Sequence, residues 1–175
     1  GRKLAYDNLI KNEIDGLVVI GGDGSFTGGL KLIEEYDFPV IGIPGTIDND
    51  LFGTSHTLGY DTALNTATEA IDKIRDTAIS HHRLFLVEVM GRDAGFIALN
   101  TGLAIGAQEI LIPEVNMSIE NLISSLKKSK SAGKTSTIIV LAEGDKTGNN
   151  VFQLADTIES KLPKYEVRVS VLGHM

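Results

Sequence analysis

Two carboxylates, a hydroxyl and a glycine follow an apolar run near the start of the chain. The run PVIGI (39–43) predicts a buried strand, and PGTIDND (44–50) comes directly after it. Asp48 and Asp50 stand two residues apart, so on an irregular loop both can point into one cavity. There one carboxylate can take a proton from a substrate hydroxyl, while the other holds Mg²⁺ through water. Thr46 can donate to a transferring phosphoryl group. The alternative is a turn whose side chains bond only their own backbone.

A glycine-rich loop, GGDGSFTGG (21–29), follows the predicted strand GLVVI (16–20). Its glycines allow close approach of the backbone to a ligand, and Ser25 opens a predicted helix whose free N–H groups attract phosphate. Asp23 would repel phosphate unless a cation lies between them, so it is a candidate Mg²⁺ ligand. The alternative is a tight strand-to-helix turn with Asp23 solvated. No Gly-Lys-Ser/Thr follows, which excludes a Walker A loop.

A third segment, MGRDAG (90–95), places Arg92 after the predicted strand RLFLVEV (83–89). The planar guanidinium suits the charge spread over phosphoryl oxygens. Taken alone, Arg92 would more often form a surface ion pair with a neighbour such as Asp93.

The elements expected around these segments alternate between short apolar strands and helices. This alternation predicts an α/β fold with a mostly parallel, helix-covered sheet, or two small sheets sharing the chain. In such folds ligands gather at the carboxyl ends of the strands, where the polar segments of this sequence lie. The expected strands are 16–20, 39–43, 83–89, 109–113, 136–142 and 167–172, and the expected helices lie near 25–36, 60–78, 94–105, 118–130 and 151–161.

Composition narrows the class of protein. The 175 residues carry a net charge of −7, which argues against nonspecific binding to nucleic acid or anionic membranes. There is no cysteine, so neither a disulfide nor a thiolate metal site can form. No apolar run is long enough for a membrane span, and a cytoplasmic protein is expected. The chain begins inside what reads as a helix and ends as a strand finishes, which suggests a fragment of a longer chain. The residues alone indicate a magnesium-dependent phosphoryl transferase and do not name the acceptor.

With these segments in order, the chain resembles the bacterial-type 6-phosphofructokinases. The motifs that carry the resemblance are GGDGS (21–25), PGTIDND (44–50), HRLFLVEVMGR (82–92), PE (113–114), AE (142–143) and RVSVLGH (168–174). The resemblance implies a Rossmann-like, three-layer α/β/α fold with two similar subdomains. Residues 1–59 would be part of the ATP-binding domain, and residues 60–175 an incomplete sugar-phosphate-binding domain.

The family's reaction moves the γ-phosphoryl of ATP to the 1-hydroxyl of fructose 6-phosphate, with Mg²⁺. The resemblance implies that Asp48 is the base, that Asp23 binds Mg²⁺ and that Asp50 contacts the metal or its water. Thr46 and Arg92 would hold the transferring phosphoryl, with Ile47 beside them in the substrate loop. The residues implied to line the ATP phosphates are Gly22, Asp23, Gly24, Ser25 and Gly28. Those implied to position the sugar are Met90, Gly91 and Glu143, and those implied to hold its 6-phosphate are Arg83, Arg168 and His174.

The resemblance also implies a homo-oligomer, a tetramer by family pattern, because the counterpart of Arg83 reaches across from a neighbouring subunit. Arg75 and Lys134 match basic residues that bind allosteric effectors, although Gln108 stands where a glutamate is common. Family members that use pyrophosphate typically carry Asp at position 24 and Lys at position 45. Both are glycine here, which favours ATP. The alternatives are a pyrophosphate-dependent enzyme, a noncatalytic regulatory subunit, and a lipid or NAD kinase suggested by GGDGS alone.

Overall fold

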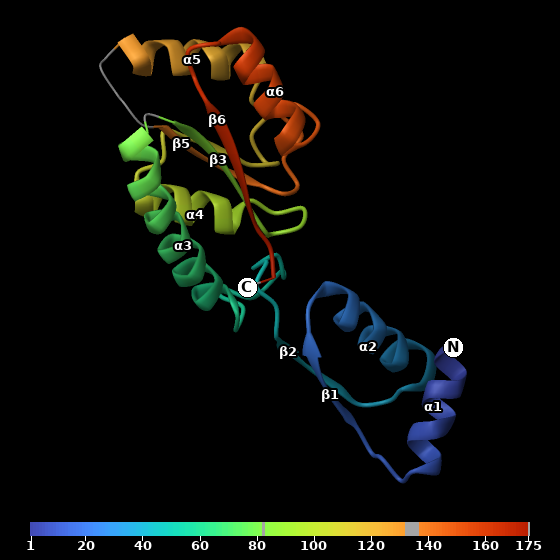
Figure 1. Cartoon of the computed structure of the whole chain (residues 1–175). Coiled ribbons are helices and arrows are strands. Elements are labelled where there is room, and N and C mark those ends of the chain that lie inside the picture. The colour runs from blue at the N-terminus through green and yellow to red at the C-terminus, as the bar shows by residue number, and fades with distance from the viewer. Residues whose placement is uncertain (82, 132–136, 175) are drawn as a thin grey trace. The chain divides into compact units, whose positions relative to one another are not determined.

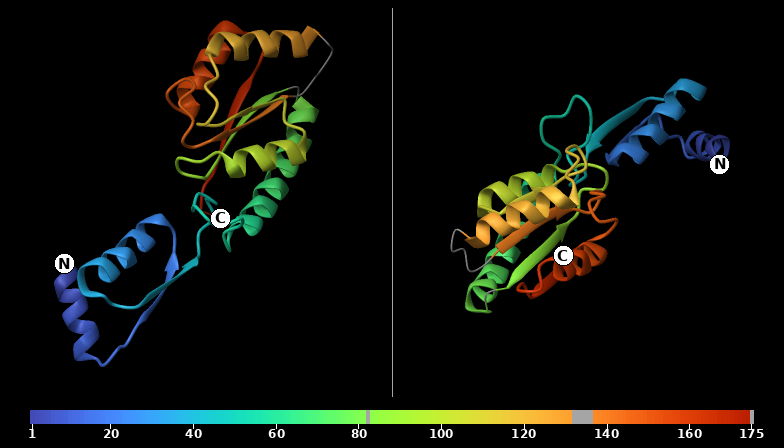
Figure 2. Two further views of the ribbon diagram at one scale, coloured as in Figure 1. Left: turned by 180° about the vertical axis from the view of Figure 1, so that it is seen from behind. Right: turned by 90° about the horizontal axis from the view of Figure 1, so that it is seen from above.

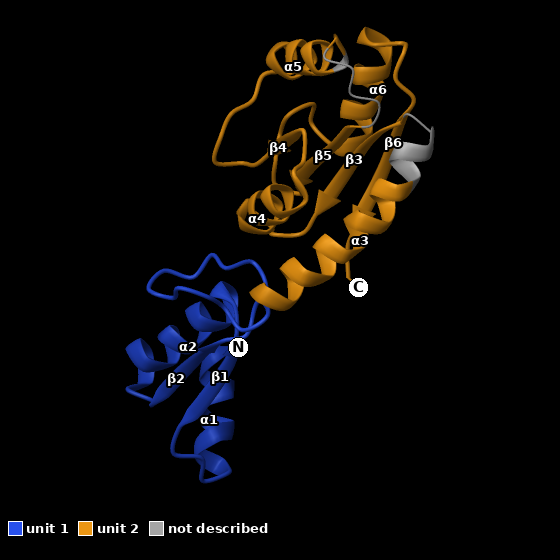
Figure 3. Cartoon of the chain, turned by 90° about the vertical axis from the view of Figure 1, so that its left-hand side faces the viewer, with its two compact units in different colours: residues 1–59 blue, residues 60–175 orange. Residues whose placement is uncertain are grey.

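The computed structural model describes residues 1–81, 83–131 and 137–174. The chain divides into two compact units, residues 1–59 and 60–175 (Figure 3). What each unit binds stays a prediction. In the described part of the chain, no helix is both long enough and apolar enough to cross a membrane.

Unit 1 is built on two parallel strands, β1 (Leu17–Gly21) and β2 (Val40–Pro44), paired from Leu17 with Val40 to Gly21 with Pro44. Helix α2 (Asp23–Tyr36) connects them and covers one face of the sheet, with α1 (Arg2–Lys11) beside α2 (Figure 1). The approach of α2 is close, because a Cβ on Gly29 would lie 3.0 Å from Val40 Cγ1.

The second face of the β1–β2 sheet is apolar and open. Val18, Ile20 and Ile41 are 60%, 68% and 67% exposed. Strand residues alternate between faces, so the residues between them turn toward α2 and are more buried. Unit 1 on its own is therefore a sheet covered on one side only.

Unit 2 holds a four-stranded parallel sheet in the order β4-β5-β3-β6. Helices alternate with these strands along the chain, and Figure 2 shows them on both sides of the sheet. The bounds are α3 (Tyr60–His81), β3 (Leu84–Val89), α4 (Phe96–Ile105), β4 (Glu109–Leu111), α5 (Ile119–Ser131), β5 (Thr137–Ala142), α6 (Val151–Lys161) and β6 (Val167–Leu172).

The central strands β3 and β5 of unit 2 are buried on both faces, which explains why they are continuous apolar runs. Leu84 and Leu86 of β3 pack with α5 and α6 in one core, and the intervening Phe85 and Val87 are also buried, on the opposite face. Helices α3 and α4 cover that opposite face, where they contact β3, β5 and each other. The predicted α/β fold with parallel sheets and three layers is confirmed.

Most predicted boundaries differ from the structure by one to three residues, and two of the differences are informative. Helix α2 begins at Asp23, two residues before Ser25, so Asp23 lies in the first turn of the helix rather than in the loop. Strand β4 ends at Leu111 instead of 113. Pro113 cannot donate a backbone hydrogen bond to a sheet ladder, which accounts for the early end. Ser118 caps the start of α5, because its Oγ accepts a hydrogen bond of 3.2 Å from the backbone N–H of Asn121.

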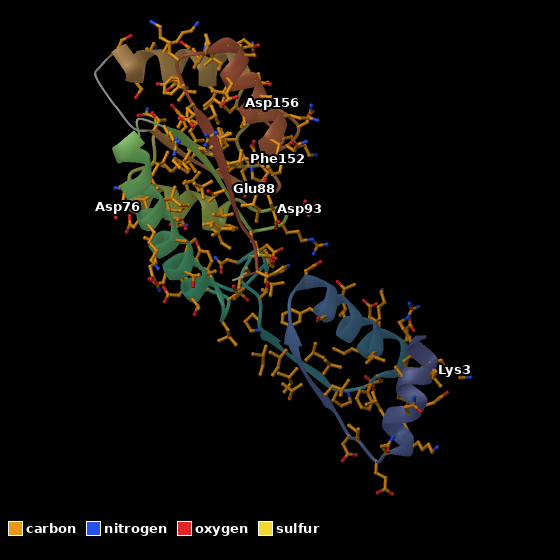
Figure 4. All side chains as sticks on the ribbon, viewed as in Figure 1. Lys3, Asp76, Glu88, Asp93, Phe152 and Asp156 are labelled. Carbon is orange, nitrogen blue, oxygen red and sulfur yellow. The ribbon has the colours of Figure 1, made fainter. Side chains whose placement is uncertain are left out.

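Glu88 is a charged residue in the central strand of unit 2. It is half-buried on the same face as Leu84 and Leu86, near the carboxyl end of β3 (Figure 4). Burial raises the pKa of its carboxyl group, and the charge of Glu143 raises it further. The charged form of Glu88 is therefore disfavoured in the folded protein.

We predict that Glu88→Gln stabilises the protein at neutral pH. Because the pKa of Glu88 is raised in the folded state, its carboxyl group lowers the free energy of unfolding as the pH rises through that folded pKa. At low pH the group is protonated in both the folded and the unfolded state, so it has no such effect. The gain in melting temperature over the wild type should therefore be larger at pH 7.5 than near pH 4.5. Asp156→Asn, which removes an equal charge from an exposed site on α6, is the control. A gain that does not depend on pH would contradict the prediction.

Candidate active site

In unit 1, the glycine-rich loop and the carboxylate loop lie side by side. Their strands are parallel, and the register pairs Gly21 with Pro44, so both loops leave the sheet at the same edge. A Cβ on Gly22 would lie 3.4 Å from Thr46 Cβ. The predicted nucleotide segment and the predicted phosphoryl-transfer segment are thus brought together.

The amino terminus of α2 has the features of a phosphate site. Gly22 is the N-cap, with no side-chain hydrogen bond across it, and its carbonyl accepts from the N–H of Phe26. A Cβ added at Gly24 or Gly28 would meet nothing within 4 Å, so both glycines border open space. The N–H groups of a first helical turn favour an anion placed in such a space.

Asp23 is an exposed carboxylate in this first turn. Among the described residues, no three His, Asp or Glu side chains are grouped so as to hold a metal ion. A single carboxylate still fits Mg²⁺, which usually keeps several waters and takes its remaining ligands from substrate phosphates. The donor set therefore suits a metal that arrives with a nucleotide.

The loop that follows β2 is held by its own backbone. Leu58 N–H donates to the carbonyl of Pro44 at 2.9 Å, and Gly59 N–H donates to that of Thr46 at 3.1 Å. Asn49 adopts the left-handed conformation, with φ of 56°, and its Oδ1 accepts from the N–H of Thr57 at 2.9 Å. Asn tolerates this conformation better than most residues. Sequence reasoning missed this role of Asn49, for which a polar Asn between two aspartates was the available signal.

Asp48 and Asp50 flank Asn49 in different surroundings. Asp48 is half-buried, and its backbone N–H donates to Thr46 Oγ1 at 3.3 Å. Asp50 is exposed, whereas Ile47 is half-buried. Of the two carboxylates, Asp48 lies in the more enclosed setting, which suits a base that must act away from bulk water.

In unit 2, a second group of predicted residues meets at the carboxyl edge of the sheet. Val89 pairs with Ala142 of β5 and with Leu172 of β6. Residues 90–92, Glu143 and His174 therefore all follow strands that end at the same edge. Glu143 Oε1 accepts from the backbone N–H groups of Gly91 at 3.2 Å and Arg92 at 2.6 Å. The Arg92 side chain is 66% exposed, with a weak ion pair to Asp93 at 3.8 Å.

Arg83 and Arg168 lie at the opposite, amino edge of the same sheet. Arg83 precedes β3 and Arg168 is the second residue of β6. Arg83 Nε lies 3.0 Å from Glu166 Oε2, and Glu166 Oε1 accepts a hydrogen bond from Arg168. The six residues of β3 span roughly 20 Å at about 3.3 Å per residue. Within one chain, these arginines are thus not brought together with His174.

Glu114, to which sequence reasoning gave no role, accepts a hydrogen bond from the backbone of the segment that contains Arg92. Glu114 Oε1 accepts from the N–H of Gly95 at 2.8 Å, at the start of α4. The negative charge also complements the positive end of the helix dipole. The PE motif was its only signal in the sequence.

The two predicted effector residues have different outcomes. Arg75 donates a hydrogen bond to the carbonyl of Ile105 and lies 3.9 Å from Asp72, so it joins α3 to the end of α4. Lys134 lies outside the described residues. The effector role of both stays a prediction.

Comparisons with known proteins agree with these motifs. The family model described as phosphofructokinase matches residues 1–175. The ATP-dependent 6-phosphofructokinase 2 of Bacteroides thetaiotaomicron is 53% identical over 175 residues, which are 100% of this chain and 53% of that protein. The ATP-dependent 6-phosphofructokinase 1 of Thermus thermophilus is 54% identical over 100% of this chain and 54% of its own length. The chain thus spans about half the length of the curated relatives it matches.

Solved structures show the same fold. The T-state phosphofructokinase of Pichia pastoris matches with a TM-score of 0.88 and 34% identity, over 99% of this chain and 21% of that one. A pyrophosphate-dependent phosphofructokinase from Marinobacter aquaeolei matches with a TM-score of 0.76 at 24% identity, over 97% of this chain and 47% of that one, which is a likeness of fold alone. Since the family model spans every residue, and the loops at the strand ends carry the family's motifs, the chain belongs to the phosphofructokinase family.

Proposed function

We propose that the protein containing this chain is an ATP-dependent 6-phosphofructokinase. It transfers the γ-phosphoryl of ATP to the 1-hydroxyl of D-fructose 6-phosphate and releases fructose 1,6-bisphosphate and ADP. The observation that carries the proposal is 53–54% identity, over the whole chain, to bacterial proteins named ATP-dependent 6-phosphofructokinase. The activity belongs to the full-length protein.

In this proposal unit 1 binds the phosphates of ATP. Support comes from the open space beside Gly24 and Gly28 at the amino terminus of α2. The N–H groups of Gly22 to Ser25 would contact the phosphates, and Asp23 would hold Mg²⁺. When bound, Mg²⁺ would neutralise charge on the phosphate oxygens.

Asp48 would accept the proton of the sugar 1-hydroxyl, while the oxygen of that hydroxyl attacks the γ-phosphorus of ATP. The bond from that phosphorus to the β–γ bridging oxygen breaks, and ADP leaves with the electron pair. Thr46 and Arg92 would donate to the oxygens of the transferring group, and Asp50 would order water or metal nearby. The half-buried setting of Asp48 beside Thr46 supports this division of roles.

We also propose that the sugar-phosphate site is shared between two copies of the chain in a homo-oligomer. Met90, Gly91, Arg92, Glu143 and His174 would come from the carboxyl edge of one copy. Arg83 and Arg168 lie at the amino edge, a strand length away, so they would complete the site of a neighbouring copy. Such an exchange is natural at a two-fold interface, where each copy gives what it receives.

The first test of the proposed function concerns Asp48. Asp48→Ser in the full-length protein should lower kcat about a hundredfold to ten-thousandfold, the range that a general base typically contributes. Binding of fructose 6-phosphate should change little. A coupled assay with ATP, Mg²⁺ and fructose 6-phosphate measures kcat, and calorimetry measures binding. Losses that appear mainly in KM would assign Asp48 to uniform substrate binding instead. Turnover by the wild type with pyrophosphate but not with ATP would favour a pyrophosphate-dependent enzyme. Binding of fructose 6-phosphate or ATP without any turnover would favour a regulatory subunit.

The second test concerns the phosphoryl donor. Gly24→Asp should lower kcat/KM for ATP about tenfold or more, because a carboxylate placed there repels the α-phosphate. A Cβ at this position meets nothing within 4 Å, so the melting temperature should be unchanged. Gly24→Asn has nearly the same shape without the charge and is the matched control. Equal use of ATP by the Asp variant and the wild type would rule out this account of donor choice.

The third test probes the shared site by mixing two inactive variants. Asp48→Ser and Arg168→Ala are each expected to be inactive alone. After joint refolding or co-expression, one kind of site in a mixed oligomer has both Asp48 and Arg168 intact. Random pairing restores about a quarter of the sites. If the mixture stays inactive although native mass spectrometry detects mixed oligomers, Arg168 acts within its own chain.

A further inference from the structure

Arg92 occupies a backbone conformation that it would not adopt unaided. Its φ is 54°, and Gly91 before it has a φ of 141°. The N–H of Ala94 donates to the carbonyl of Gly91 at 2.9 Å, which closes the segment as a turn. A left-handed conformation costs a residue other than glycine roughly 1–2 kcal/mol, so surrounding contacts must hold it.

The first of these contacts is Glu143. A single oxygen, Oε1, accepts from the N–H groups of both Gly91 and Arg92, at 3.2 and 2.6 Å. Glu143 is itself fixed by the sheet, because its own N–H donates to the carbonyl of Val89 at 2.9 Å. Hydrogen bonds to a charged acceptor are stronger than neutral ones. The carboxylate therefore acts on the backbone of the turn rather than on the guanidinium.

The second contact is Gly144. A Cβ added there would lie 2.2 Å from the carbonyl oxygen of Arg92 and 3.2 Å from Asp93 Cα. Both neighbouring atoms belong to the backbone, so no side-chain rotation could relieve the clash. Position 144 has to be glycine for the turn to approach the backbone of residue 144 this closely.

We propose that Glu143 and Gly144 are positioning residues for Arg92 and act through the backbone of the turn 91–94. The consequence for catalysis rests on the proposed function, in which Arg92 holds the transferring phosphoryl. This role goes beyond contact between Glu143 and the sugar. It also gives Gly144, which has no side chain to offer a substrate, a part in the phosphoryl-transfer step.

The proposal predicts a distinct kinetic pattern for Gly144→Ala in the full-length protein. A displacement of the turn by about 1 Å should lower kcat tenfold or more. KM for fructose 6-phosphate should change less than about threefold, because no group that contacts the sugar is removed. Glu143→Ala should also lower kcat, whereas Glu143→Gln keeps an acceptor oxygen and should recover part of the loss.

A double-mutant cycle with Arg92→Ala separates positioning from general damage. If Gly144 acts through Arg92, adding Gly144→Ala to Arg92→Ala should cause little further loss of kcat. Fully additive losses would overturn the proposal, as would an unchanged kcat in a Gly144→Ala protein with normal melting temperature. Should Gly144→Ala fail to fold, the cycle of Glu143→Gln with Arg92→Ala decides in the same way.

Amide hydrogen exchange tests the turn itself, whatever the enzyme's substrate proves to be. The N–H groups of Gly91 and Arg92 should be protected in the wild type and should exchange faster in Glu143→Ala. Unchanged exchange would refute the positioning role directly. If the wild type lacks phosphofructokinase activity and Glu143→Ala still speeds the exchange of these two N–H groups, only the proposed function is rejected.

Discussion

The parallel register of β3 with both its neighbours is the constraint on which the candidate site in unit 2 depends. Val89 pairs with Ala142 and with Leu172, so three strands end level at one edge. Hydrogen bonding and two buried faces hold that register, because a slip by one residue would turn Leu84 and Leu86 away from their core. The loops that follow these strands, among them residues 90–92 and Glu143, are thereby placed at one edge of the sheet. Unit 1 repeats the arrangement with two strands, whose register sets Gly22 beside Thr46.

Much of this could be predicted from the sequence, and the reasons are physical. Apolar runs of the right length fix where strands lie, and Ser118 marks a helix start because its side chain satisfies a free N–H. Boundaries were less certain: Asp23 already belongs to α2, since the helix needs no side-chain cap beyond Gly22. The opposite-edge position of Arg83 and Arg168 follows from strand direction, which is implicit in the sequence. Their ion pairs with Glu166 depend on which strands become neighbours, and no local pattern contains that information.

The features that sequence reasoning missed share one cause: a side chain that serves a distant stretch of backbone. Glu114 supports Gly95, and Glu143 supports the turn of Arg92, at separations of 19 and 51 residues. A carboxylate near a predicted site invites a role toward the ligand, and in both cases part of its hydrogen-bonding capacity is given to the protein. The role of a glycine is equally hard to predict from the sequence. Gly24 borders open space, whereas Gly144 lies against the backbone of another loop. The sequence alone does not distinguish these two surroundings.

The open apolar face of the β1–β2 sheet distinguishes unit 1 from unit 2. Unit 2 encloses a buried core between its sheet and helices α5 and α6. Val18, Ile20 and Ile41 leave unit 1 with a large water-exposed apolar surface, and a two-stranded sheet gains little stability alone. A surface that covered this face would remove these side chains from water and so stabilise unit 1, whereas the uncovered face can pair with other apolar surfaces and favours aggregation.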